Sequence, residues 1–213
     1  MVHSILPADR ERRLTLVFLH GMGGRMRDWS FLRMAFDLPW LEMVVLQGPI
    51  PHGKGWAWFE LDERHRKTDR TFADIARSRG LLLEMLRSLD RDPASIVLGG
   101  FSQGCTIAID TALREDVPLA GVLGISGYLP QIGDMPDGLG PLARSRRILV
   151  THGRTDRTIP LEMAQNQYTA LGGLGVPLER EVFDKGHTLD LDHEVPRIRR
   201  WLRSLAGSDS VED

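Results

Sequence analysis

Short apolar runs alternate along the chain with segments in which apolar residues recur at helical spacing. A run of about four to eight apolar residues is typical of a strand buried on both faces of a parallel sheet, and helical spacing is typical of an amphipathic helix. The runs predict strands at residues 14–19, 43–46, 96–100, 119–125 and 148–150, and an alternating pattern predicts a further strand at 178–183. Helical spacing predicts helices at residues 29–36, 71–89, 103–113, 161–171 and 195–205. This alternation predicts an α/β fold with a doubly wound, mostly parallel sheet flanked by helices.

The ends of these elements follow from polar residues and glycines. Asp28 is expected to cap the first helix, and Gly172 with Gly173 is expected to stop the fourth. Residues 131–142 are rich in glycine and proline and are expected to form a loop. We expect residues 1–206 to form a single domain without a separate cap domain, and residues 207–213 to form a flexible acidic tail.

Residues 48–70 form a long connection between predicted elements, and connections of this length are usually functional or mobile. Its first half contains the aromatic residues Trp56, Trp58 and Phe59, and its second half carries charges of both signs. The mixed charges favour a solvated face over a nucleic-acid patch. The aromatic residues fit two interpretations equally well, the wall of a cleft or a small satellite core.

Composition and charge narrow the classes of function. The 213 residues carry a net charge of −2, which argues against a nucleic-acid partner. The single cysteine, Cys105, excludes an internal disulfide and a site with several thiolates; we expect it to be an inert packing residue. The first residues do not resemble a secretory leader, and no apolar run approaches the roughly 20 residues that span a bilayer, so we expect a cytoplasmic protein without a membrane span.

The segment Gly100-Phe101-Ser102-Gln103-Gly104 follows a predicted strand and precedes a predicted helix. A serine on so sharp a turn adopts strained backbone angles, and glycines two residues away on either side leave room for the neighbouring strand and helix. The Ser102 hydroxyl would then stand clear of the sheet. An ordinary tight turn is the alternative, so the rest of the chain has to supply the partners of a nucleophile.

A serine nucleophile needs a base, and the base needs a carboxylate that orients it. In hydrolases with this strand–turn–helix, the chain order is serine, acid, histidine. Ser102, Asp156 and His187 occur in that order, each just after a predicted strand, where the working edge of such a sheet lies. We therefore predict these three as the catalytic residues.

The chain contains other histidines and acids that compete with this set. His152 and His20 are expected to have structural roles, and His193 is expected to face solvent. Asp184 and Asp190 flank His187 closely in sequence and stay open as alternatives to Asp156.

An acyl-transfer site also needs main-chain N–H groups that stabilise an oxyanion. We expect one from Gln103, at the start of the helix after Ser102, and the other from Met22, in the glycine-rich loop after the first strand.

The sequence resembles the acyl-protein thioesterase and small carboxylesterase (phospholipase/carboxylesterase) family of α/β-hydrolases. The matching segments are Leu19-His20-Gly21-Met22-Gly23, Gly100-Phe101-Ser102-Gln103-Gly104, Ser126-Gly127-Tyr128-Leu129-Pro130, His152-Gly153-x-x-Asp156-x-x-Ile159-Pro160 and Gly186-His187. The resemblance implies an α/β-hydrolase fold, the same triad and the same oxyanion amides. It also matches Trp58-Phe59 to an element of the family beside the cleft.

The chain departs from the family at three places. Residues 23–27 read Gly-Gly-Arg-Met-Arg where the thioesterases usually carry a Gly-Asp pair, Cys105 replaces a glycine or another small residue, and residues 54–70 differ from those of eukaryotic members. We expect Trp56, Trp58, Phe59, Tyr128 and Leu129 to line the substrate cleft together with Met22.

These observations predict a serine hydrolase that cleaves carboxylic esters or thioesters of small to medium acyl groups through an acyl-enzyme. No cofactor or metal is required, and apolar surface near the cleft could support a homodimer. The alternatives are acyl transfer by the same triad and a hydrolase fold that only binds a ligand.

Overall fold

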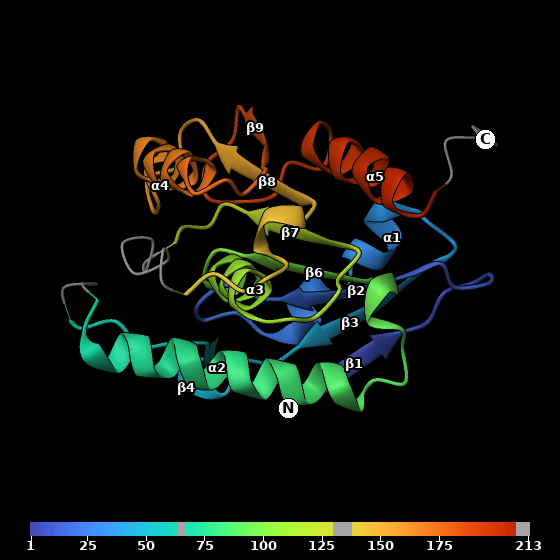
Figure 1. The fold of residues 1–213 in the computed structure, drawn as a ribbon, viewed down its shortest axis with the longest axis horizontal. Coiled ribbons are helices and arrows are strands. Elements are labelled where there is room, and N and C mark those ends of the chain that lie inside the picture. Colours follow the sequence, from blue (N-terminus) through green and yellow to red (C-terminus); the bar gives the residue numbers. More distant parts are fainter. Residues whose placement is uncertain (64–66, 130–137, 208–213) are drawn as a thin grey trace.

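A seven-stranded sheet forms the centre of the computed structural model, which describes residues 1–63, 67–129 and 138–207 (Figure 1). The strands follow the order β1-β3-β2-β6-β7-β8-β9 across the sheet. Their bounds are β1 (His3–Leu6), β2 (Leu14–Leu19), β3 (Leu41–Leu46), β6 (Ile96–Phe101), β7 (Gly121–Ile125), β8 (Ile148–Gly153) and β9 (Glu179–Phe183). The loop expected at 131–142 lies largely, and the tail expected at 207–213 almost wholly, outside the described residues.

All neighbouring strands in this sheet run parallel except β1, which pairs antiparallel with β3. The predicted mostly parallel, doubly wound sheet is therefore confirmed. Strand β1 was not predicted, because its polar and apolar residues show no continuous apolar run; its pairing with β3 comes from the tertiary structure.

Helices cover both faces of the sheet (Figure 1). They are α1 (Leu32–Phe36), α2 (Asp69–Ser88), α3 (Gln103–Arg114), α4 (Leu161–Gly173) and α5 (Glu194–Leu205). Alternate residues of β2 pack against helices on opposite faces of the sheet. Leu16 and Phe18 belong to the core cluster that contains residues of α1 and α5. Val17 and Leu19 belong to the cluster that contains residues of α2 and α3. A third cluster, on the same side as α3, contains α4. Two-sided burial explains why the strands read as nearly continuous apolar runs.

Three local predictions were wrong. The segment expected to be one helix at 29–36 is a 3₁₀ turn (Met26–Trp29) followed by α1, and Asp28 accepts a hydrogen bond from the Arg25 N–H instead of capping α1. Helix α4 extends through Gly172 to Gly173 and is capped by Leu174, so the glycine pair does not stop it at Leu171.

The long connection at residues 48–70 contains a hairpin that the sequence pattern did not predict. Its strands, β4 (Ile50–His52) and β5 (Gly55–Ala57), pair antiparallel. Trp56 of β5 also bridges to Gly24, so the hairpin is fastened to the glycine-rich loop after β2. Helix α2 follows, with Thr68 as its cap.

Strand β9 forms one edge of the sheet and carries charged side chains on both faces. Glu179 and Glu181 bind Arg197 of α5, with contacts of 2.7 and 2.6 Å. Arg180, on the opposite face, donates to the Thr169 hydroxyl of α4 at 3.0 Å. The edge strand is thus tied to helices on both sides.

None of the helices in the described part of the chain is both long enough and apolar enough to cross a membrane.

Candidate active site

Ser102 stands at the turn between β6 and α3, in a backbone conformation that few residues other than glycine adopt, with φ 54° and ψ −116°. The turn is held from both sides: the Ser102 N–H donates to the Ile125 carbonyl at 2.9 Å, and the Ser102 carbonyl accepts from the Thr106 N–H at 3.2 Å. A serine that main-chain hydrogen bonds hold in a strained backbone conformation is typical of a nucleophile elbow.

The two glycines of the turn are required by close main-chain packing. A Cβ on Gly100 would overlap the main chain of Gly104, and a Cβ on Gly104 would overlap the carbonyl of Leu19. The expected steric role of these glycines is therefore confirmed.

Ser102, His187 and Asp156 lie in one line of hydrogen bonds. The Ser102 Oγ is 3.0 Å from the His187 Nε2, and the His187 Nδ1 is 2.7 Å from the Asp156 Oδ2. A carboxylate only accepts, so the Nδ1–H donates to Asp156 and the Nε2 is free to accept from the serine hydroxyl. The imidazole therefore has the tautomer that can take the proton of Ser102.

Asp156 is fixed by the main chain that follows it. Its Oδ1 accepts from the N–H groups of Thr158 and Ile159, both at 2.9 Å, which leaves Oδ2 for His187. The carboxylate side chain has no exposed surface, whereas the His187 side chain keeps 18% of its own. A buried, hydrogen-bonded carboxylate that faces an accessible imidazole can hold that imidazole and stabilise its protonated form.

His152 is buried beside Asp156 but points its Nε2–H at the Ile159 carbonyl, at 2.9 Å, with the Asp156 Oδ2 farther away at 3.5 Å. Burial lowers the pKa of His152, so this imidazole is held neutral. It shapes the loop that carries Asp156.

The remaining alternatives, His193, Asp190 and Asp184, form contacts with other groups. His193 is largely exposed and bonds to Asp190, whose carboxylate also accepts main-chain N–H groups of the turn before α5. Asp184 forms an exposed pair with Arg154. Within the described residues, the hydrogen bonds of the His187 ring go to Asp156 and Ser102 and to neither of these acids.

The glycine-rich loop after β2 passes directly beside Ser102. A Cβ on Gly21 would lie 3.3 Å from the Ser102 Cβ. His20 holds this loop, since its Nδ1–H donates to the Gly21 carbonyl at 2.7 Å and its Nε2 accepts from the Gly48 N–H at 3.0 Å. Burial lowers the pKa of His20, in keeping with a neutral structural imidazole.

The main-chain N–H groups of Met22 and Gln103 donate to no acceptor within the part of the chain that the structure describes. For Gln103 this follows from its place at the first turn of α3, where N–H groups lack an acceptor within the helix. The Gln103 side chain is occupied elsewhere: it accepts from the Trp58 N–H at 3.0 Å and donates to the Phe59 carbonyl at 2.9 Å.

An open cleft of about 410 Å³ lies next to His187. Its lining is mostly apolar and aromatic, and consists of Asp28, Trp29, Phe31, Phe101, His187, Thr188, Leu189 and Leu191. The Phe101 ring lies 4.8 Å from the His187 ring and 4.9 Å from the Trp29 ring, measured between centroids. Of these lining residues, the sequence pattern predicted only His187 as part of the site. Phe101 could have been inferred as well, because it lies next to Ser102 in the glycine–serine motif.

Three of the residues expected to line the cleft are core residues. Trp58 and Phe59 have no exposed surface and pack with α2 and α3, and Leu129 is 1% exposed in the cluster that contains α4. The Trp58 Nε1–H donates to the His20 carbonyl at 2.8 Å, so this residue supports the glycine-rich loop from beneath. Trp58 and Phe59 thus belong to the main core between the sheet and helices α2 and α3, which neither the cleft wall nor a small satellite core describes.

The other expected lining residues keep some surface. Met22 is 38% exposed, and Trp56 and Tyr128 are half-buried. Trp56 exchanges main-chain hydrogen bonds with Gly23 and Gly24. Burial raises the pKa of Tyr128 to about 12, so its phenol stays protonated. Their contact with a substrate stays a prediction.

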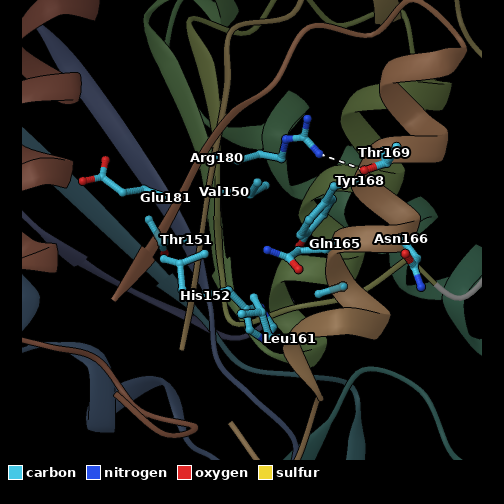
Figure 2. A pocket seen from close by; sticks show the side chains of 12 residues that line it. Val150, Thr151, His152, Leu161, Gln165, Asn166, Tyr168, Thr169, Arg180 and Glu181 are labelled. Atoms are coloured by element: carbon cyan, nitrogen blue, oxygen red, sulfur yellow. Dashed lines mark hydrogen bonds between the residues drawn. The ribbon is translucent and has the colours of Figure 1, made fainter. Parts of the chain in front are cut away.

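A second pocket, of about 420 Å³, lies between α4 and strands β8 and β9 (Figure 2). Its lining is more polar and includes His152, Gln165 and Asn166, with Arg180 bonded to Thr169. It shares no lining residue with the cleft beside His187. The cleft is therefore the candidate active site, because it alone of the two is lined by a member of the hydrogen-bonded line.

Cys105 is completely buried in α3, and burial raises the pKa of its thiol to about 12. Its sulfur fills space that a side chain on Gly127 would need. Both observations agree with the expected packing role. In the part of the chain that the structure describes, no group of three or more His, Cys, Asp or Glu side chains could hold a metal ion.

Comparisons with known proteins identify relatives of this chain in one family. The family model described as Phospholipase/Carboxylesterase matches residues 2–204. Acyl-protein thioesterase 1 of Schizosaccharomyces pombe is 30% identical over 156 residues, which cover 68% of this chain and 70% of the relative. A probable inactive carboxylesterase of Oryza sativa subsp. japonica is 25% identical, covering 89% of this chain and 84% of its own length.

Solved structures agree on the fold. The crystal structure of esterase PE8 aligns with a TM-score of 0.84 at 24% identity, and covers 95% of this chain and 97% of its own.

Proposed function

The chain belongs to the phospholipase/carboxylesterase family of α/β-hydrolases, and on that premise we propose that it is a serine hydrolase acting through a triad of Ser102, His187 and Asp156. Its substrates are carboxylic esters or thioesters of small to medium acyl groups. The observation that carries the proposal is the line of hydrogen bonds of 3.0 and 2.7 Å that joins the serine hydroxyl to a buried carboxylate through one imidazole.

In the proposed reaction, the Ser102 Oγ attacks the acyl carbon while the His187 Nε2 takes its proton. Asp156 holds the imidazole and stabilises its charge. The protonated His187 then gives its proton to the departing alcohol or thiol, and the acyl group stays on Ser102. Water, deprotonated by the same imidazole, attacks the acyl-enzyme and frees the acid.

The negative oxygen that forms in each attack is proposed to lie between the N–H groups of Met22 and Gln103. Two observations support this proposal: within the described residues neither N–H group has a hydrogen-bond acceptor, and the glycine-rich loop passes beside Ser102. Removing one such donor typically costs about 10²–10³ in kcat.

The cleft of Trp29, Phe31, Phe101, Leu189 and Leu191 is proposed to hold the apolar part of the substrate. It is open at the surface, which favours small to medium acyl groups over a long chain enclosed in a tunnel.

Cytoplasmic location and dimer formation stay predictions.

Hydrolysis of p-nitrophenyl esters and acyl thioesters by the wild type and by Ser102→Ala tests the proposal. We expect the variant to lose about 10⁴-fold or more in kcat and to lose labelling by a fluorophosphonate. Ser4→Ala, at a serine of strand β1, is the matched control and should keep both. Turnover retained by Ser102→Ala would overturn the proposed role, and a wild type that neither reacts with fluorophosphonate nor turns over esters would favour a ligand-binding protein.

Product analysis with added alcohols and thiols separates hydrolysis from acyl transfer. Free acid as the main product supports the hydrolase. A new ester or thioester as the main product would identify the triad as that of an acyltransferase.

A further inference from the structure

Lys185 carries a buried charge two residues before His187. It lies two residues after the end of β9, and its side chain is 3% exposed. Burial lowers the pKa of this ammonium, while Glu194 and Asp156 raise it. A lysine is rarely buried so fully unless its charge is paired.

All three protons of the Lys185 ammonium have an acceptor. The Nζ lies 2.6 Å from the Glu194 Oε2, 2.7 Å from the Thr188 carbonyl and 3.1 Å from the Ser126 Oγ. Glu194 has no exposed surface, and its Oε2 also accepts from the Asp190 N–H at 3.0 Å. One buried pair thus fixes the main chain at 188 and at 190, just after His187.

The main chain of Lys185 is fixed too, on the other side of His187. Its carbonyl accepts from the N–H and the hydroxyl of Thr155, at 3.1 and 3.0 Å. Thr155 precedes Asp156, so the same residue joins the loop of the base to the loop of the acid. Gly153 allows this approach, because a Cβ there would overlap the Lys185 carbonyl.

We propose that Lys185, paired with Glu194, is a positioning residue that holds the His187 loop against the Asp156 loop, so that the imidazole stays between its two partners. The inference rests on the proposed function and adds the support of its base. Replacing a buried ion pair by apolar residues of similar size is often neutral for stability, so stability alone does not account for the pair. Its contacts instead converge on the residues around His187.

The double variant Lys185→Met/Glu194→Gln tests the proposal, because it removes both charges and leaves neither unpaired. We expect kcat for a p-nitrophenyl ester to fall about 10–10²-fold with KM changed less than about threefold, as for a small displacement of a catalytic group. The downfield proton resonance of the His187 Nδ1–H in its bond to Asp156 should weaken or vanish.

Glu42→Gln/Arg91→Met is the matched control. Arg91 binds the buried Glu42 through two contacts of 2.8 and 3.0 Å. Glu42 lies at the start of β3 and so at the opposite end of the sheet from Ser102. This variant should keep both kcat and the resonance. If the control loses kcat as much as the Lys185 variant, or if the Lys185 variant keeps kcat and resonance, the proposal is wrong.

Near-UV circular dichroism establishes whether each variant is folded. If the double variant is not, Glu194→Gln alone decides: it keeps an oxygen for the Lys185 ammonium but removes the charge, and we expect the same changes in smaller degree. The resonance is read without turnover, so it tests Lys185 even if the wild type proves inactive, an outcome that would count against the proposed function alone.

Discussion

The His187 Nδ1 lies 2.7 Å from one oxygen of Asp156, while the other oxygen of that carboxylate accepts two main-chain N–H groups. The two oxygens therefore have fixed and different roles. Substitution at Asp156 is expected to act through this asymmetry.

Asp156→Asn is expected to lower kcat by about 10⁴-fold with little loss of stability. The amide oxygen should take the place of Oδ1, where the N–H groups of Thr158 and Ile159 need an acceptor, so the NH₂ group faces His187. The Nδ1 then has to accept, the Nε2 carries the proton, and it cannot take the proton of Ser102. Ester hydrolysis measures the loss. Asp184→Asn, at the exposed acid paired with Arg154, is the control, and a comparable loss there would contradict the assignment.

Gly104→Ala is expected to destabilise the protein by about 1–3 kcal/mol or more, because the new Cβ would overlap the Leu19 carbonyl. Gly172→Ala is the opposite case. That position in α4 has open space around it, so the variant should gain about 0.5–1 kcal/mol from helix propensity. Urea unfolding measures both changes. Equal effects at the two glycines would show that the close approach at the turn is not what requires Gly104.

Leu191→Ser is expected to reduce kcat/KM for an octanoyl ester by about tenfold more than for an acetyl ester, since a longer acyl group would contact this wall of the cleft. Met34→Ser, which alters a highly exposed apolar residue outside the lining, should leave that ratio unchanged. Kinetics with p-nitrophenyl esters of both lengths give the comparison. A ratio unchanged in Leu191→Ser would place the acyl group elsewhere.

Acid should destabilise the fold through His20 and His152, whose pKa values burial lowers. Between these lowered values and the ordinary value of about 6.5, the unfolded chain binds a proton that the folded chain does not, so the free energy of unfolding falls as pH drops below about 6.5. Each imidazole contributes up to about 1.4 kcal/mol per pH unit. His20→Gln should reduce the slope, as measured by urea unfolding at several pH values, and an unchanged slope would contradict the role of His20.

Cys105 should be unreactive in the folded protein. Its thiol is fully buried and its pKa is about 12, so almost no thiolate is present or accessible at pH 8. A disulfide reagent such as 5,5′-dithiobis(2-nitrobenzoate) should modify one thiol per chain in guanidinium chloride and almost none without it. Rapid modification of the folded chain would show that the helix after Ser102 opens readily.

The sequence pattern predicted most of the sheet because two-sided burial leaves a direct mark on the chain. Buried parallel strands such as β2 and β6 are apolar at nearly every position, and glycines with polar residues follow them. Ser102, Asp156 and His187 follow strands β6, β8 and β9, and their order along the chain sufficed to predict residues that the structure places within hydrogen-bond distance.

What the pattern did not predict depends on contacts between distant segments. Strand β1 needs β3 as a partner, and the hairpin of β4 and β5 needs the glycine-rich loop. Trp58 and Phe59 are equally consistent with a cleft and a core until α2 is placed over them. Lys185 gave no signal, because a lysine in a polar loop is normally exposed and only the position of Glu194 makes its burial favourable.

The charges on β9 restrict how copies of this chain could associate. A strand added to this edge would have to lie alongside Glu179 and Arg180, and would compete with the ion pairs that Arg197 forms with Glu179 and Glu181. Charged edges of this kind oppose the joining of sheets end to end. A second copy of the chain would therefore meet less resistance at the apolar rim of the cleft, around Phe31 and Leu191, than along this strand.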